Sequence, residues 1–189
     1  IGSRLVGSEM CIRDRGGSKS PYEKNGTFYG DLSAILIDNM PFWAEFSSTP
    51  SNKTSLMNDW NYKIDAIINE TLNENVTSLA GVPSWMLVLL NKILEKSNKE
   101  YISEQWPNLE VYFHGGVSFK PYLNQYKSLI NSESMKYYEI YNASEGFFAI
   151  QYENDSNGLL LMLDYGIFYE FISMKNYCLL YTSPSPRDV

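Results

Sequence analysis

The chain has 189 residues, with 15 Lys and Arg against 22 Asp and Glu, one His and a net charge of −7 at pH 7. This acidic balance argues against a nucleic-acid partner or an anionic membrane surface, because both require a basic patch. Polar residues interrupt the longest apolar stretches, Trp85–Leu94 and Leu159–Phe171. Neither approaches the ~20 apolar residues of a membrane span, so we expect no membrane partner.

The two ends of the chain differ in composition from the rest. All four arginines lie near the ends, and so do both cysteines. DNA encoding Leu5–Asp14 can be written so that its reverse complement, read in a shifted frame, encodes Cys178–Arg187. Two opposed copies of one DNA segment resemble transposase adapter ends, which, like an affinity tag, carry no information about a fold. We therefore interpret residues 1–15 and 178–189 as adapter-derived and residues 16–177 as a fragment of the native protein. A signal peptide is disfavoured, because residues 1–15 hold no continuous apolar region.

The central stretch, residues 16–177, has 11 Lys against 19 Asp and Glu, and it contains neither Arg nor Cys. Its charge is therefore 11 − 19 = −8. Without Cys this stretch cannot contain a disulfide framework or a thiolate metal site.

The first half of the central stretch predicts loops, a strand and a helix. Gly16–Gly30 is polar and glycine-bearing, which is typical of a loop, and the apolar run Leu32–Ile37 indicates a strand. Pro41–Pro50 shows no clear period. From Ser55, a plausible N-cap, apolar residues recur at spacings of three and four and predict one helix face: Leu56, Trp60, Ile64, Ile67, Ile68 and Leu72.

The second half alternates strands and helices before becoming rich in strands. Val76–Ala80 predicts a short strand, and Pro83 then begins a buried helix, since Pro is favoured at a first helical position. A strand at Leu109–Phe113 follows the break at Trp106–Asn108, and an amphipathic helix covers Phe119–Ile130. Further strands are expected at Lys136–Tyr141, Gly146–Tyr152, Leu159–Leu163 and Gly166–Ile172, with a hairpin turn at Asn154–Gly158. The pattern predicts an α/β fold with mixed sheets and packed helices.

The first candidate site is the sequence FHGGVSF at Phe113–Phe119, where a strand ends in two glycines before a helix. Glycines let the backbone approach a ligand closely, and in α/β sheets ligands bind beyond the carboxyl ends of strands. A tight strand-to-helix turn without any ligand explains the same residues. His114 more often satisfies a backbone group at such a strand end than it catalyses a reaction.

The second candidate site is the sequence YNASEGFF at Tyr141–Phe148. Ser144 offers a donor for a phosphate oxygen, and Glu145 offers a carboxylate for Mg²⁺, which often binds through one carboxylate plus substrate phosphates. Tyr141 offers a flat face on which a base can stack. The alternative is a capped loop in which Ser144 and Glu145 bond to the local backbone.

YNASEGFF resembles the second signature motif of the Gretchen-Hagen-three family, the acyl acid–amido synthetase branch of the adenylate-forming enzymes. SLAGVPSWMLVLL, WPNLEVYFHGG and LLLMLDYGIFYEF occur in the family's order and spacing, so the resemblance covers residues 16–177. It implies the central part of the large N-terminal domain of an adenylate-forming enzyme in the cytoplasm. The implied reaction consumes ATP with Mg²⁺ and joins a carboxylic acid to an amino acid amine through an acyl-adenylate.

The resemblance also implies roles for individual residues. Ser144 and Glu145 are the expected catalytic residues, with Ser144 contacting the adenylate phosphate and Glu145 holding the metal. The nucleotide is expected to contact Gly115, Gly116, Val117, Tyr141, Asn142, Ala143 and Ser144. The acyl pocket is expected at Val82, Ser84, Trp85 and Met86, although Trp85 is equally explained as simple packing.

The family's phosphate loop and its later Arg and Asp motif are absent from residues 16–177, so we expect this polypeptide alone to be inactive and poorly folded. Three other readings stay open. In an acyl-CoA-type ligase the acceptor is a thiol, and a non-catalytic domain only binds nucleotide. An α/β hydrolase with Ser144 as its nucleophile fits less well, because Asn142 replaces a motif glycine and the only His precedes Ser144.

Overall fold

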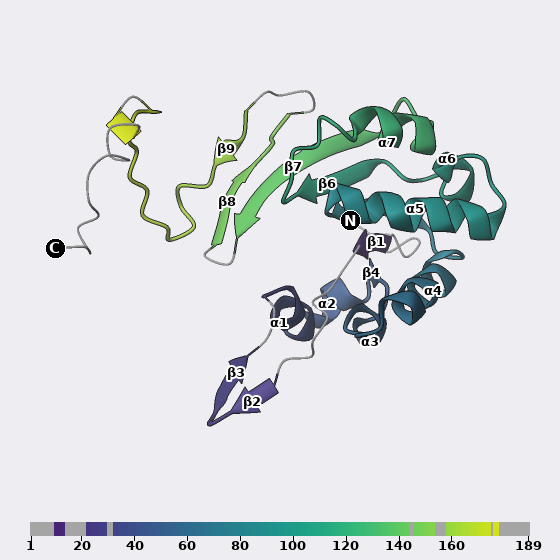
Figure 1. The fold of residues 1–189 in the computed structure, drawn as a ribbon, viewed down its shortest axis with the longest axis horizontal. Coiled ribbons are helices and arrows are strands. Elements are labelled where there is room, and N and C mark those ends of the chain that lie inside the picture. The colour runs from purple at the N-terminus through teal and green to yellow at the C-terminus, as the bar shows by residue number, and fades with distance from the viewer. Residues whose placement is uncertain are drawn as a thin grey trace, which may run out of the picture.

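The computed structural model describes residues 10–13, 22–29, 32–143, 146–153, 158–174 and 176–177. The main sheet in this part of the chain has seven strands in the order β4-β1-β5-β6-β7-β8-β9 (Figure 1). The first five strands are parallel to one another, and the β7–β8 and β8–β9 pairs are antiparallel. The strands are β4 (Ser48–Thr49), β1 (Met10–Arg13), β5 (Val76–Gly81), β6 (Val111–Gly115), β7 (Lys136–Ala143), β8 (Gly146–Ile150) and β9 (Leu160–Leu161). The predicted α/β class with a mixed sheet is confirmed.

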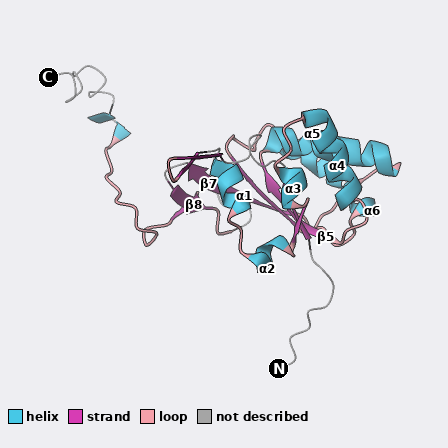
Figure 2. Cartoon of the chain, turned by 90° about the horizontal axis from the view of Figure 1, so that it is seen from below, coloured by secondary structure: helices cyan, strands magenta, loops and turns pink. Residues whose placement is uncertain are grey.

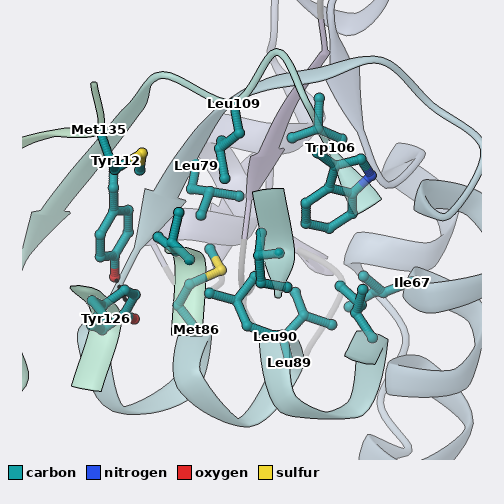
Figure 3. Close-up of a cluster of buried hydrophobic side chains, with 14 of the residues drawn as sticks. Ile67, Leu79, Met86, Leu89, Leu90, Trp106, Leu109, Tyr112, Tyr126 and Met135 are labelled. Carbon is teal, nitrogen blue, oxygen red and sulfur yellow. Dashed lines mark hydrogen bonds between the residues drawn. The ribbon is translucent and has the colours of Figure 1, made fainter. Parts of the chain in front are cut away.

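Four helices cover one face of this sheet, and the core lies between them and the strands (Figure 3). The helices are α4 (Trp60–Thr71), α5 (Pro83–Ser97), α6 (Ile102–Gln105) and α7 (Leu123–Ile130). Leu79 and Tyr112 are register partners on β5 and β6 and point into this core. The Tyr126 hydroxyl donates to the Pro83 carbonyl oxygen at 2.8 Å and so joins α7 to the start of α5.

Helix α1 (Leu32–Asp38) borders the opposite face of the sheet. The short helices α2 (Phe42–Glu45) and α3 (Asn52–Ser55) follow it (Figure 2). Because side chains alternate along a strand, Ala80 and Phe113 point away from the core formed by Leu79 and Tyr112. Ala80 and Phe113 therefore belong to the face of the sheet that α1 borders.

Strand β1 lies within the segment that we interpret as adapter-derived. Its backbone pairs with β4 on one side and with β5 on the other. Pairing of this kind uses backbone groups that every non-proline residue carries. It does not depend on the origin of the residues, and the adapter interpretation stays a prediction. Residues 178–189 lie outside the described residues.

Two expectations for the first half of the chain are wrong. Leu32–Ile37 forms the helix α1 and not a strand, because a short apolar run has no period that separates a buried strand from a buried helix. The next long helix begins at Trp60 with Asp59 as its N-cap, whose Oδ1 accepts from the backbone N–H groups of Asn61 and Tyr62 at 3.0 and 3.2 Å. Ser55 is instead the last residue of α3, whose N-cap is Ser51.

Two further expectations are corrected. Within Gly16–Gly30, β2 (Tyr22–Lys24) and β3 (Thr27–Tyr29) form an antiparallel hairpin. Its turn residues Asn25 and Gly26 have φ of 55° and 75°, the left-handed backbone that such tight turns require. Gly166–Ile172 forms no strand. Residues 154–157 of the predicted hairpin turn lie outside the described residues.

The predicted elements on and just before the two motifs are confirmed. β5, β7 and β8 start at the predicted residues, α5 starts at Pro83, and β6 starts two residues later than predicted. The described helices include none that is long and apolar enough to cross a membrane.

Candidate functional site

A cavity of about 490 Å³ lies on the α1 side of the sheet, where β5, β6 and β7 end. These strands are parallel, so their carboxyl ends meet at one edge, where ligands of open α/β sheets bind. The volume falls in the range of small-molecule sites. The cavity is lined by Leu36, Ile37, Met40, Ala80, Gly81, Val82, Phe113, His114, Gly115, Gly116, Ile140, Asn142 and Phe147.

Gly115 and Gly116 both line this cavity, but each must be glycine for a different reason. A Cβ on Gly115 would lie 2.4 Å from the carbonyl oxygen of Ile140 on the neighbouring strand. Gly116 has a φ of +81°, in the left-handed region that side chains rarely adopt. The close approach at Gly115 is thus to the chain's own backbone, and Gly116 makes the turn that leaves β6.

The YNASE motif reaches the cavity through Asn142, which is one of the lining residues. Ala143 ends β7, and Ser144 and Glu145 lie outside the described residues. The phosphate and metal roles of Ser144 and Glu145 therefore stay predictions. The described residues contain no cluster of three or more His, Cys, Asp or Glu suited to a metal ion.

Tyr141 does not line the cavity. The side chain exposes 56% of its surface, and its ring lies 5.3 Å from the ring of Phe148 on β8. Strand alternation puts Tyr141 on the same face as Tyr137, which packs against the core. Val117 is also exposed and outside the cavity lining. Because the cavity lies on the other face of the sheet, a ligand that stays within it cannot stack on Tyr141.

The four residues expected to border the acyl pocket lie in different environments. Val82 lines the cavity, whereas Ser84, Trp85 and Met86 do not. Met86 is fully buried in the core between α5 and the sheet (Figure 3). The Trp85 ring makes an edge contact with Trp60 at 5.0 Å. Of these four residues, only Val82, the N-cap of α5, lines the cavity.

Leu36, Ile37 and Met40 of the α1 region were not predicted as site residues, and neither was Phe147. The sequence signal for α1 is weak, because its apolar run is short and lacks a helical period. Phe147 lies opposite Asn142 in the β7–β8 pairing. Cross-strand partners share one face of a sheet, so only the pairing reveals that Phe147 faces the cavity.

His114 lines this cavity and also a second cavity of about 600 Å³ beside α7. It is 3% exposed, and its ring stacks on Phe119 with ring centroids 3.9 Å apart. Its Nδ1 has no hydrogen-bond partner among the described residues. Burial lowers the pKa of His114 to about 4, because a desolvated imidazolium is unfavourable. The imidazole is therefore neutral at pH 7, which suits packing better than acid–base catalysis.

The sheet order and the cavity define an α/β domain with a cavity at the carboxyl ends of parallel strands. Residues 5–135 match the GH3 family N-terminal domain. The chain belongs to this family, as its motifs indicated. The match ends before Tyr141, so the YNASEGFF motif lies beyond it.

Comparison with solved structures and curated proteins adds little to this assignment. The crystal structure of CmiS6 is similar to this chain with a TM-score of 0.38 and 12% sequence identity. The similarity covers 78% of this chain but 30% of CmiS6, so the chain spans less than a third of that protein. No curated protein matches the sequence.

Proposed function

We propose that this chain is part of an ATP-dependent ligase that joins a carboxylic acid to the amine of an amino acid. The cavity beyond β5, β6 and β7 carries the proposal, because Gly115, Gly116 and Asn142 of two separate motifs line it together. Family membership supports an enzyme that forms acyl-adenylates. Such a reaction draws on cellular ATP, and we place the protein in the cytoplasm.

The proposed reaction has two steps. A carboxylate oxygen of the acid attacks the α-phosphorus of ATP, and the bond from phosphorus to pyrophosphate breaks. The amino acid nitrogen then attacks the acyl carbon of the adenylate, AMP leaves with the electron pair of the C–O bond, and the nitrogen loses a proton. In this scheme the chain holds both reactants at the end of the sheet, because positioning turns a bimolecular encounter into a local one.

Glu145 and Ser144 are the residues that we propose for the phosphate end of the nucleotide. Glu145 supplies the carboxylate through which Mg²⁺ binds, and Mg²⁺ offsets the charge that develops on phosphate oxygens. Both residues follow Ala143, the last residue of β7, and so lie next in sequence to the cavity residue Asn142.

The direct test is binding of AMP and Mg²⁺–ATP to the purified chain, measured by calorimetry or ligand-detected NMR. Asn142→Trp should fill the cavity mouth and weaken AMP binding about tenfold or more, as expected when a bound ligand loses its space. Asn61→Trp places the same side chain on an exposed position of α4 and should leave AMP binding unchanged. Glu145→Gln should weaken the binding of Mg²⁺–ATP and leave the binding of metal-free AMP unchanged. AMP binding that is equally strong in Asn142→Trp and in the unaltered chain would contradict the proposal.

A further inference from the structure

We propose that the α1 region selects the carboxylic acid, with Leu36, Ile37 and Met40 forming a wall that receives the acid's apolar body. This inference rests on the proposed function. It assigns acid selection to a segment that none of the sequence motifs includes. We call these three residues the α1 wall.

The α1 wall combines buried and exposed apolar side chains. All three residues line the same cavity as Gly115 and Gly116. Ile37 is 6% exposed and, with the fully buried Ala34, anchors the helix. Leu36 keeps 60% of its surface exposed although it lines the cavity. Binding of a ligand that covers Leu36 would be favoured in proportion to the apolar area removed from water.

The remaining lining determines the chemistry of the ligand at this wall. Ala80, Phe113, Ile140 and Phe147 add apolar surface, and no lining residue carries a charged side chain at pH 7. His114 and Asn142 are the polar residues of the lining, but the His114 ring packs on Phe119 toward α7, so Asn142 supplies the polar side chain. A buried carboxylate without a partner is costly. The acid's carboxylate therefore belongs near the motif end at Asn142, and its uncharged body belongs against the α1 wall.

A competing arrangement uses the same lining, because an adenine ring is also flat and uncharged. In that arrangement the α1 wall borders the nucleotide, and changes in it would weaken AMP. If the wall borders the acid, the same changes alter the preference among acids and leave AMP binding unchanged. The two arrangements therefore predict opposite results for one set of variants.

The experiment compares binding of AMP, acetate and 3-phenylpropionate to the full chain and to Leu36→Trp. Leu36 is exposed, so the variant should fold, and circular dichroism checks this. We expect Leu36→Trp to weaken 3-phenylpropionate about tenfold or more, since pocket size discriminates ligands by such factors, and to leave AMP within about twofold. Val88→Trp, at a 39% exposed position of α5 away from the cavity lining, is the matched control and should change neither.

Met40→Ala provides a second variant that removes bulk. It should bind acids larger than 3-phenylpropionate, such as 4-phenylbutyrate, more tightly relative to acetate than the unaltered chain does. Equal loss of AMP and acid in Leu36→Trp, or unchanged acid binding in both variants, overturns the assignment of the α1 wall while the ligase proposal stands. If the unaltered chain binds neither AMP nor any acid, the proposed function itself fails and this inference fails with it.

Discussion

Gly115 and His114 are neighbours on β6 whose side-chain requirements come from different surroundings. Gly115 lines the cavity and has the Ile140 carbonyl oxygen where a Cβ would lie, whereas His114 packs on Phe119 toward α7. Both residues were selected from one motif in the sequence. At the scale of single residues, one motif therefore carries two constraints, which are the close backbone approach at Gly115 and the ring packing of His114.

Gly115→Ala should destabilise the chain by about 2 kcal/mol or more, because overpacking against rigid backbone cannot relax by moving a flexible side chain. The new Cβ would lie 2.4 Å from the Ile140 carbonyl oxygen. Gly158→Ala is the matched control, since its Cβ would meet no atom within 4 Å. Urea unfolding of both variants measures the difference. Equal stability of the two would contradict the close approach at Gly115.

His114 should make stability depend on pH in one window. Its pKa is about 4 in the folded chain and about 6.5 when unfolded, so only the unfolded state binds a proton between these values. The stabilisation is therefore complete above pH 6.5 and is lost as the pH falls toward 4, by up to about 3 kcal/mol.

Urea unfolding at pH 7.0, 6.0 and 5.0 tests this, because carboxylates contribute mainly at lower pH. His114→Phe keeps an aromatic ring beside Phe119 and should flatten the dependence over this range. His114 is the only His of the chain, so no other imidazole confuses the comparison. A variant that keeps the full pH dependence would show that His114 titrates normally in the folded state.

At the scale of elements, the sequence predicted best where local and tertiary preferences agree. α5 begins at Pro83, β5 and β7 start where predicted, and β6 ends at the first residue of the glycine pair. The prediction of a strand at Leu32–Ile37 was wrong, because a short apolar run fits either a strand or a helix. The predicted N-cap at Ser55 was wrong, because the regular apolar spacing continues upstream of the true N-cap, Asp59.

Asp59→Ala should destabilise the chain by about 1 kcal/mol, the usual effect of removing an N-cap side chain. Its Oδ1 accepts two backbone N–H groups that otherwise have no partner within the helix. Asp65→Ala, an exposed position within the same helix, is the control and should have little effect. Thermal unfolding of the two variants provides the measurement. If Asp65→Ala cost as much as Asp59→Ala, capping would not be the cause.

At the scale of the molecule, the chain matches the family's N-terminal domain over residues 5–135. Residues 16–177 contain no Arg, and the expected phosphate loop is absent from them. We therefore expect the purified chain to catalyse no ATP–pyrophosphate exchange even where it binds AMP, because transfer at phosphorus requires groups that offset the charge on phosphate oxygens. Exchange above the level of a protein-free control would contradict this expectation.

The sequence alone determined the α/β class, the strands that carry the two motifs and the family. These features depend on periodicity, turn chemistry and motif spacing, all of which are local along the chain. Only the tertiary structure decided which face of β7 borders the cavity, because that depends on where α1 and the core helices pack, and it thereby put Asn142 in the lining and left Tyr141 out of it. It also decided that α1 completes the cavity, since contacts between segments distant in sequence leave no periodic signal in either segment.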